Sequence, residues 1–128
     1  MESMHSSAAA YHPVNLHGLK WSPGEKGVAR KVFDQALQRE LDAITQEVKR
    51  RARDIKVASE LWELEDYLSE SRKKINDKYD YRYSTLPIVF GQLLREGRIS
   101  IDELRGLGDD KVGYIQRVAG FGEKEAGE

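Results

Sequence analysis

Apolar residues recur at intervals of three and four along the first half of the chain. The stripe consists of Val28, Val32, Phe33, Ala36, Leu37, Leu41, Ile44, Val48, Ala52 and Ile55. This spacing places the side chains on one face of an α-helix, and no proline interrupts it. Ser22 can cap the first free amides and Pro23 suits the first helical position. The pattern therefore predicts one long helix from about residue 24 to residue 55.

This helix is too long for a compact subunit of this size. It would extend about 48 Å at 1.5 Å per residue, whereas a globule of this chain length is roughly 36 Å across. An exposed apolar stripe is covered most simply by a second helix and by a second copy of the chain. We therefore predict a homodimer. Its interface includes Phe33 and the coiled-coil-like seam Leu37, Leu41, Ile44 and Val48.

A second long helix is predicted after a break near residues 56–58. Ser59 is a good N-cap, and acidic residues crowd the turn that follows, where the helix dipole favours them. The second half of this helix is basic, which suits the opposite end of the dipole. Its expected inward residues are Leu61, Leu64, Leu68, Ile75 and Tyr79.

Three short helices are expected in the last third of the chain. The first begins near Leu86 and Pro87 and ends at Gly97, and Ser100 and Glu103 form a capping box that starts the second. The third spans about residues 109–119 and turns Val112, Ile115 and Val118 to one side. The predicted fold is all-α and forms an antiparallel homodimer. It comprises a mobile tail (1–21), a two-helix stem that dimerises (22–84), a small helical head (85–119) and a polar tail (120–128).

Charge and composition narrow the function. The chain has 128 residues, with 22 acidic against 21 basic side chains and no cysteine. This balance disfavours nucleic acid as a partner, although the basic run from Lys49 to Arg53 leaves phosphate binding as a minor alternative. No apolar run approaches the roughly 18 residues of a membrane span, so we expect a cytoplasmic protein.

No motif of catalysis or cofactor binding stands out. Phosphate-binding glycine loops, zinc-protease motifs, nucleophile elbows and calcium loops are absent from the sequence. Glu65 and Asp66 are adjacent, so on a helix they point about 100° apart and do not share a site. His5, His12 and His17 have spacings that match no compact metal-ligand motif. We expect a protein that is not an enzyme and has no cofactor.

Several stretches together resemble the fluorescence recovery protein family. They are Trp21-Ser22, Gln38-Arg39-Glu40-Leu41-Asp42, Leu61-Trp62-Glu63-Leu64-Glu65-Asp66-Tyr67-Leu68-Ser69 with Arg72, Lys78-Tyr79-Asp80, and Phe90-Gly91-Gln92-Leu93-Leu94 with Glu96-Gly97. The resemblance spans about residues 21–118 without a gap. It implies an all-helical homodimer with a stem and a head. It also implies binding to the C-terminal domain of photoactivated orange carotenoid protein, detachment of that protein from the phycobilisome and faster return to its resting form. Thylakoid association would follow through that partner.

The resemblance also suggests which residues act. Trp62, Asp66 and Arg72 match stem positions linked to partner contact, and Trp62 and Arg72 also match positions linked to dimer integrity. The alternative is that Trp62 fills the core and Arg72 pairs with Glu65 or Asp66. The predicted partner-binding set is completed by Tyr67, Glu65, Ile88, Phe90 and Tyr114.

Three of these positions depart from the family pattern. Glu65 replaces a usual histidine, Ile88 an aromatic residue and Tyr114 a lysine. A change from histidine to glutamate would repel an acidic patch on the same partner. The sequence therefore leaves open a second function, a helical interaction dimer that serves a different client protein.

Overall fold

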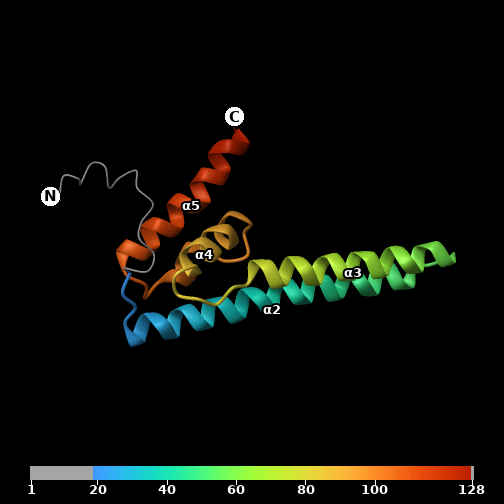
Figure 1. Ribbon diagram of the computed structural model, residues 1–128, viewed down its shortest axis with the longest axis horizontal. Helices are drawn as coiled ribbons and strands as arrows, with labels where there is room; N and C mark the ends of the chain where they lie inside the picture. The colour runs from blue at the N-terminus through green and yellow to red at the C-terminus, as the bar shows by residue number, and fades with distance from the viewer. Residues whose placement is uncertain (1–18, 128) are drawn as a thin grey trace.

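The computed structural model describes residues 19–127, and the regular elements in this range are all helices (Figure 1). The elements are α2 (Pro23–Arg53), α3 (Ala58–Lys78), α4 (Leu86–Arg95), the 3₁₀ turn η2 (Ile101–Leu104) and α5 (Asp109–Gly127). The all-α prediction is therefore confirmed for the described residues. The three histidines and most of the predicted N-terminal tail lie outside them.

The long helix α2 begins as the sequence predicts. The Ser22 hydroxyl accepts a hydrogen bond from the Glu25 amide, and the Glu25 carboxylate accepts one from the Ser22 amide. This reciprocal pair satisfies two of the free amides at the helix start. At the other end, Asp54 is the C-cap. With 31 residues, α2 is about 46 Å long, close to the predicted length.

One hydrophobic core joins the first half of α2 to the head. Ala29, Val32, Phe33 and Ala36 are its buried residues in α2. The same core contains Leu86, Val89, Phe90, Leu93, Ile99, Leu104, Leu107 and Ile115. The core therefore crosses the boundary predicted between residues 84 and 85, and α2 is shared by head and stem.

The two main head helices approach closely at Gly91. A Cβ atom at this position would lie 2.4 Å from Val118 Cγ1 and 3.1 Å from the carbonyl oxygen of Ile115. Such distances leave no room for a side chain, so glycine permits the contact between α4 and α5. After α4, Gly97 has a φ of 76°, which allows the left-handed conformation that often ends a helix.

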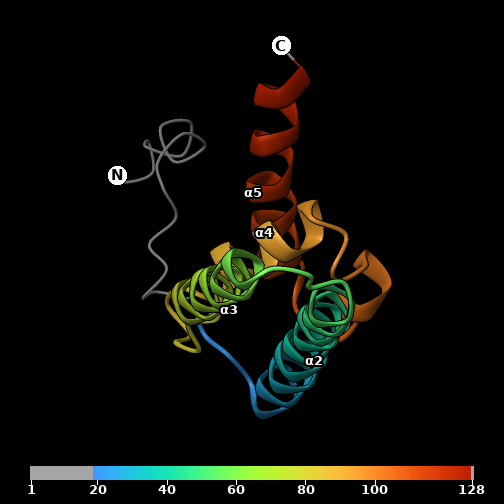
Figure 2. The same cartoon turned by 90° about the vertical axis from the view of Figure 1, so that its right-hand side faces the viewer.

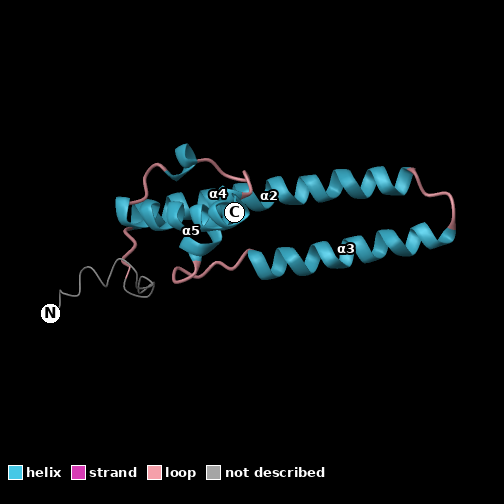
Figure 3. Cartoon of the chain, turned by 90° about the horizontal axis from the view of Figure 1, so that it is seen from above, coloured by secondary structure: helices cyan, strands magenta, loops and turns pink. Residues whose placement is uncertain are grey.

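The second half of α2 runs beside α3 to form the stem, and the loop at residues 54–57 joins them at its far end (Figure 3). None of the 21 residues of α3 is buried. Leu64, Ile75 and Tyr79 are half-buried as predicted. Leu61 and Leu68, however, are each 48% exposed, so the prediction that they turn inward is wrong within one subunit.

Two helix ends differ from the prediction. Val57, not Ser59, occupies the N-cap of α3, because the Glu60 carboxylate accepts hydrogen bonds from the amides of Lys56 and Val57. Glu60 therefore binds amides that precede the helix, whereas a Ser59 cap would have accepted from amides that follow it. Helix α5 runs to Gly127, past the predicted end at residue 119, and projects away from the stem (Figure 2).

Candidate functional site

An apolar face runs along one side of the stem. Counted at about 100° per residue, Leu61 and Leu68 lie roughly a quarter turn beyond the side of α3 that faces α2. Leu41 and Val48 have the same offset on α2. An approximate two-fold axis relates two antiparallel helices. Side chains with equal angular offsets on α2 and α3 therefore lie on the same side of the stem. We call this the stem apolar face: Leu37, Leu41, Ile44 and Val48 of α2 with Leu61 and Leu68 of α3.

Trp62 and Asp66 lie on the outer edge of the stem. They are four residues apart and therefore share a face of α3, nearly opposite the side that contacts α2. The Trp62 side chain is 61% exposed, so the alternative that it fills the core is wrong. A large exposed aromatic ring beside a carboxylate is typical of an anchor for another protein.

Tyr67 lies on the other side of α3 from Trp62. The Arg51 guanidinium carbon of α2 is 4.1 Å from the centre of its ring, and Arg51 Nε is also 2.7 Å from a carboxylate oxygen of Glu47. The cation–π contact and the ion pair together hold the Arg51 guanidinium between the two stem helices. Tyr67 therefore connects α3 to α2 and is turned away from the Trp62–Asp66 edge.

Glu65 and Arg72 are exposed and border the stem apolar face. Both have nearly the same angular offset on α3 as Leu61. Among the described residues, Arg72 forms no ion pair with Glu65 or Asp66, the pairing that the sequence left open. Its charge therefore lies exposed at the border of the stem apolar face.

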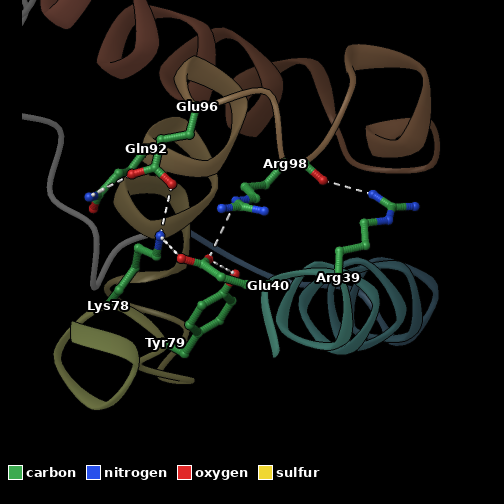
Figure 4. A network of polar contacts seen from close by, with 7 residues as sticks. All are labelled: Arg39, Glu40, Lys78, Tyr79, Gln92, Glu96 and Arg98. Carbon is green, nitrogen blue, oxygen red and sulfur yellow. Dashed lines mark hydrogen bonds and ion pairs between the residues drawn. The ribbon is translucent and has the colours of Figure 1, made fainter. Parts of the chain in front are cut away.

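A polar cluster connects the head to the stem (Figure 4). Glu40 of α2 is its centre, and its carboxylate accepts hydrogen bonds from Lys78 Nζ at 2.8 Å and from the Tyr79 hydroxyl at 2.7 Å. Arg98 Nε lies 3.7 Å from the same carboxylate, and Lys78 also binds Glu96 of α4 at 2.8 Å. We call Glu40, Lys78, Tyr79, Glu96 and Arg98 the head–stem joint.

The charges of the joint are matched. Burial alone would raise the pKa of Glu40, but hydrogen bonds from Lys78 and Tyr79 and the nearby positive charges lower it overall. Burial, together with the bond to Glu40, raises the pKa of Tyr79 above its ordinary value. Glu40 therefore stays ionised and Tyr79 stays a donor at neutral pH.

A second buried charge ties the start of α2 to the start of α5. Lys111 is only 2% exposed, and its ammonium donates to the Lys20 carbonyl oxygen at 2.5 Å. It also lies 3.1 Å from a Glu25 carboxylate oxygen and 5.1 Å from the Trp21 ring centre. These partners compensate the burial of the charge, as a buried lysine requires.

Comparison with known proteins identifies this architecture. Residues 21–119 match the family described as "Photoprotection regulator fluorescence recovery protein". The chain belongs to the fluorescence recovery protein family. A relative from Synechocystis sp., named fluorescence recovery protein, is 41% identical over 99 residues, which is 77% of this chain and 91% of the relative.

Solved structures of fluorescence recovery proteins share the fold. The protein from Fremyella diplosiphon has a TM-score of 0.76 at 39% identity, covering 78% of this chain and 98% of its own. The Synechocystis sp. PCC 6803 protein has the same TM-score at 41% identity, with the same coverage of both chains. The chain is thus a member of a family of photoprotection regulators, a class defined by regulation and not by catalysis.

In this member of the fluorescence recovery protein family, two residues that were predicted to lie at interfaces are buried in the core. Phe90 is fully buried and Phe33 is only 5% exposed, so Phe90 is not a direct partner contact and Phe33 is not at a dimer surface. Both pack in the core of the subunit, because one face of each helix must first cover the head. Their apolar periodicity alone does not distinguish the two uses.

The remaining head residues of the predicted set are accessible. Ile88 is 44% exposed, and Tyr114 is half-buried with the Arg117 guanidinium 5.6 Å from its ring centre. The structure thus places exposed candidates on both head and stem. Sequence reasoning missed the role of Glu40, whose partners lie 38 and 39 positions away.

Within residues 19–127 no helix is long and apolar enough to cross a membrane. The same described residues contain no group of three or more His, Asp or Glu side chains arranged to hold a metal ion.

Proposed function

We propose that the protein is a dimeric regulator of the fluorescence recovery type. It binds the C-terminal domain of photoactivated orange carotenoid protein, detaches it from the phycobilisome and accelerates its return to the resting form. The observation that carries this proposal is the family match across residues 21–119, which includes stem and head together. The site of action is the cytoplasm, next to thylakoids through the partner.

The stem supports the dimer. No residue of α3 is buried. The stem apolar face contains three leucines that are each at least 39% exposed, namely Leu41, Leu61 and Leu68. Apolar area of this kind gains roughly 25 cal/mol for each Å² removed from water. A second copy, related by a two-fold axis, would cover the face and place Glu65 and Arg72 at its border.

The outer edge of the stem supports the contact with the carotenoid protein. Trp62 and Asp66 point away from the stem apolar face, so they remain accessible when that face is covered. A regulator without bond chemistry acts by binding one conformation of its target, or the transition state between two, better than the other. Trp62 supplies the apolar anchor and Asp66 the charge.

The test is the rate at which photoactivated orange carotenoid protein returns from red to orange. We expect the protein to accelerate it and to form a complex on size exclusion. Trp62→Ala should abolish most of the acceleration, whereas Trp21→Phe, at the head, is the matched control that leaves it intact. An unchanged recovery rate with no complex would instead indicate a helical interaction dimer with another client, which the acidic Glu65 favours.

A further inference from the structure

Glu40 is the meeting point of three parts of the fold. It extends from α2, and its carboxylate binds Lys78 and Tyr79 at the end of α3 and faces Arg98 after α4. Lys78 continues the connection to Glu96 at the end of α4, and Gln92 also donates to Glu96 at 3.2 Å. The close view in Figure 4 shows the Lys78, Tyr79 and Arg98 side chains converging on the Glu40 carboxylate.

The joint lies where apolar packing between α3 and the head is thin. Helix α4 packs mainly on α5 and has a much smaller contact with α2. Tyr79, the C-cap of α3, packs its ring on α2, with its centre 5.4 Å from that of Phe33. The Glu40 and Lys78 side chains are 14% and 12% exposed, so water screens their attraction poorly. Much of the fixed angle between α3 and the head therefore depends on polar bonds.

We propose that Glu40 is a positioning residue that fixes the head relative to the stem. In this arrangement Ile88 and Tyr114 on the head and Trp62 and Asp66 on the stem form one composite surface for a protein partner that contacts both. This inference rests on the proposed function, because it concerns how the partner-binding residues are held. Glu40 itself does not touch the partner.

The chemistry of the joint explains why a carboxylate is required. One carboxylate has about four acceptor positions, enough for the Lys78 ammonium, the Tyr79 hydroxyl and the Arg98 guanidinium together. An amide at this position has a single acceptor oxygen, and its NH₂ group would face donors. Glu40→Gln therefore preserves the shape of the side chain but removes its negative charge and one of the two oxygen acceptors that hold the joint.

The first experiment measures the joint directly. The chain has no cysteine, so Ser69→Cys on α3 and Gln116→Cys on α5 can carry two spin labels. Labelled protein is diluted with unlabelled protein so that only distances within one subunit contribute. We expect a single narrow distance distribution, which Glu40→Gln broadens or shifts while the helical circular dichroism stays unchanged.

The matched control is Asp42→Asn. Asp42 is an exposed carboxylate two residues further along α2, and it accepts a hydrogen bond from Gln38 of the same helix. This variant should keep the narrow distribution. Tyr79→Phe, which removes one bond to Glu40 and keeps its charge, should give an intermediate result. If Glu40→Gln keeps the narrow distribution, the joint does not fix the head.

The second experiment connects the joint to function. In the red-to-orange assay, Glu40→Gln should raise the protein concentration needed for half-maximal acceleration several-fold and leave the maximal rate nearly unchanged. Half-maximal concentrations equal to that of Asp42→Asn, together with a broadened distance distribution, would overturn the composite surface. If the unaltered protein gives no acceleration, the proposed function fails, while the distance measurement still decides the role of Glu40.

Discussion

At the scale of single residues, buried charges and one glycine set the geometry of the head. Lys111 and Glu25 form an ion pair in which Glu25 also accepts from the Ser22 and Gly108 amides. The bond to the Ser22 amide is the largest contribution that lowers the pKa of Glu25, and the overall shift is downward despite burial. A single carboxylate thus connects the start of α2 to the start of α5.

This pair predicts a dependence of stability on pH. The carboxyl pKa is lower in the folded than in the unfolded protein, so the charged form stabilises the fold above the ordinary value of 4.5. This contribution is lost as the pH falls through the folded pKa. We expect the free energy of unfolding, measured by urea denaturation from pH 7 to pH 3, to decrease at the acid end. Glu25→Gln should be less stable at pH 7 and show a weaker decrease.

Gly91 gives a prediction about packing. A methyl group there would overlap the Val118 side chain, and overpacking of this kind costs typically about 1–3 kcal/mol. Gly91→Ala should therefore lower the thermal unfolding midpoint. Gly120→Ala is the control, since nothing lies within 4 Å of its added Cβ and alanine favours the helix of α5. Equal unfolding midpoints for Gly91→Ala and Gly120→Ala would show that the contact between α4 and α5 accommodates the added methyl group without cost.

At the scale of helices, ends that depend on neighbouring residues were predictable. Ser22 caps α2 and Ser100 with Glu103 forms a capping box, both as expected, because each signal is contained within four residues. The start of α3 was misplaced because the serine signal concerns amides that follow the cap, whereas the bonds that form involve amides that precede the helix. A glutamate at the third helical position can reach back to amides before the helix, and Glu60 does so.

The cap of α3 gives a prediction for this element. Glu60→Ala removes the acceptor of the Lys56 and Val57 amides and should therefore weaken the first turn of α3. Faster hydrogen exchange at these amides, measured by NMR, is the expected result. Glu63→Ala, one turn further along the same exposed helix, should leave them as protected as in the unaltered protein.

Sequence patterns located the candidate surface only in part. The apolar period of α2 and α3 correctly showed that both helices have an apolar stripe, but it gave no measure of how much of each stripe the subunit itself covers. Phe33 therefore proved to be core, and Leu61 and Leu68 proved to be exposed. The head–stem joint had no local signal, because Glu40 and its partners become neighbours only when the chain folds.

At the scale of the whole molecule, the stem apolar face predicts the assembly. Leu61→Glu combined with Leu68→Glu places charges at the centre of the proposed dimer contact. Burial of unpaired charges is costly, so this variant should sediment as a monomer near 14.6 kDa, whereas the unaltered chain should have twice that mass. Ser69→Glu, on the outer side of α3, should remain a dimer. A monomeric unaltered protein at high concentration would rule out the dimer.

The continuity of α2 from the core into the stem makes it a lever arm. Beyond Ala36, its last buried residue, the helix continues for about 25 Å, and a tilt of about 10° at the core would move its tip by roughly 4 Å. Small adjustments around the base of this arm therefore become displacements as large as a side chain at its far end. A slight rotation of α2 at the core would therefore decide whether the far end of the stem matches the surface of a bound protein.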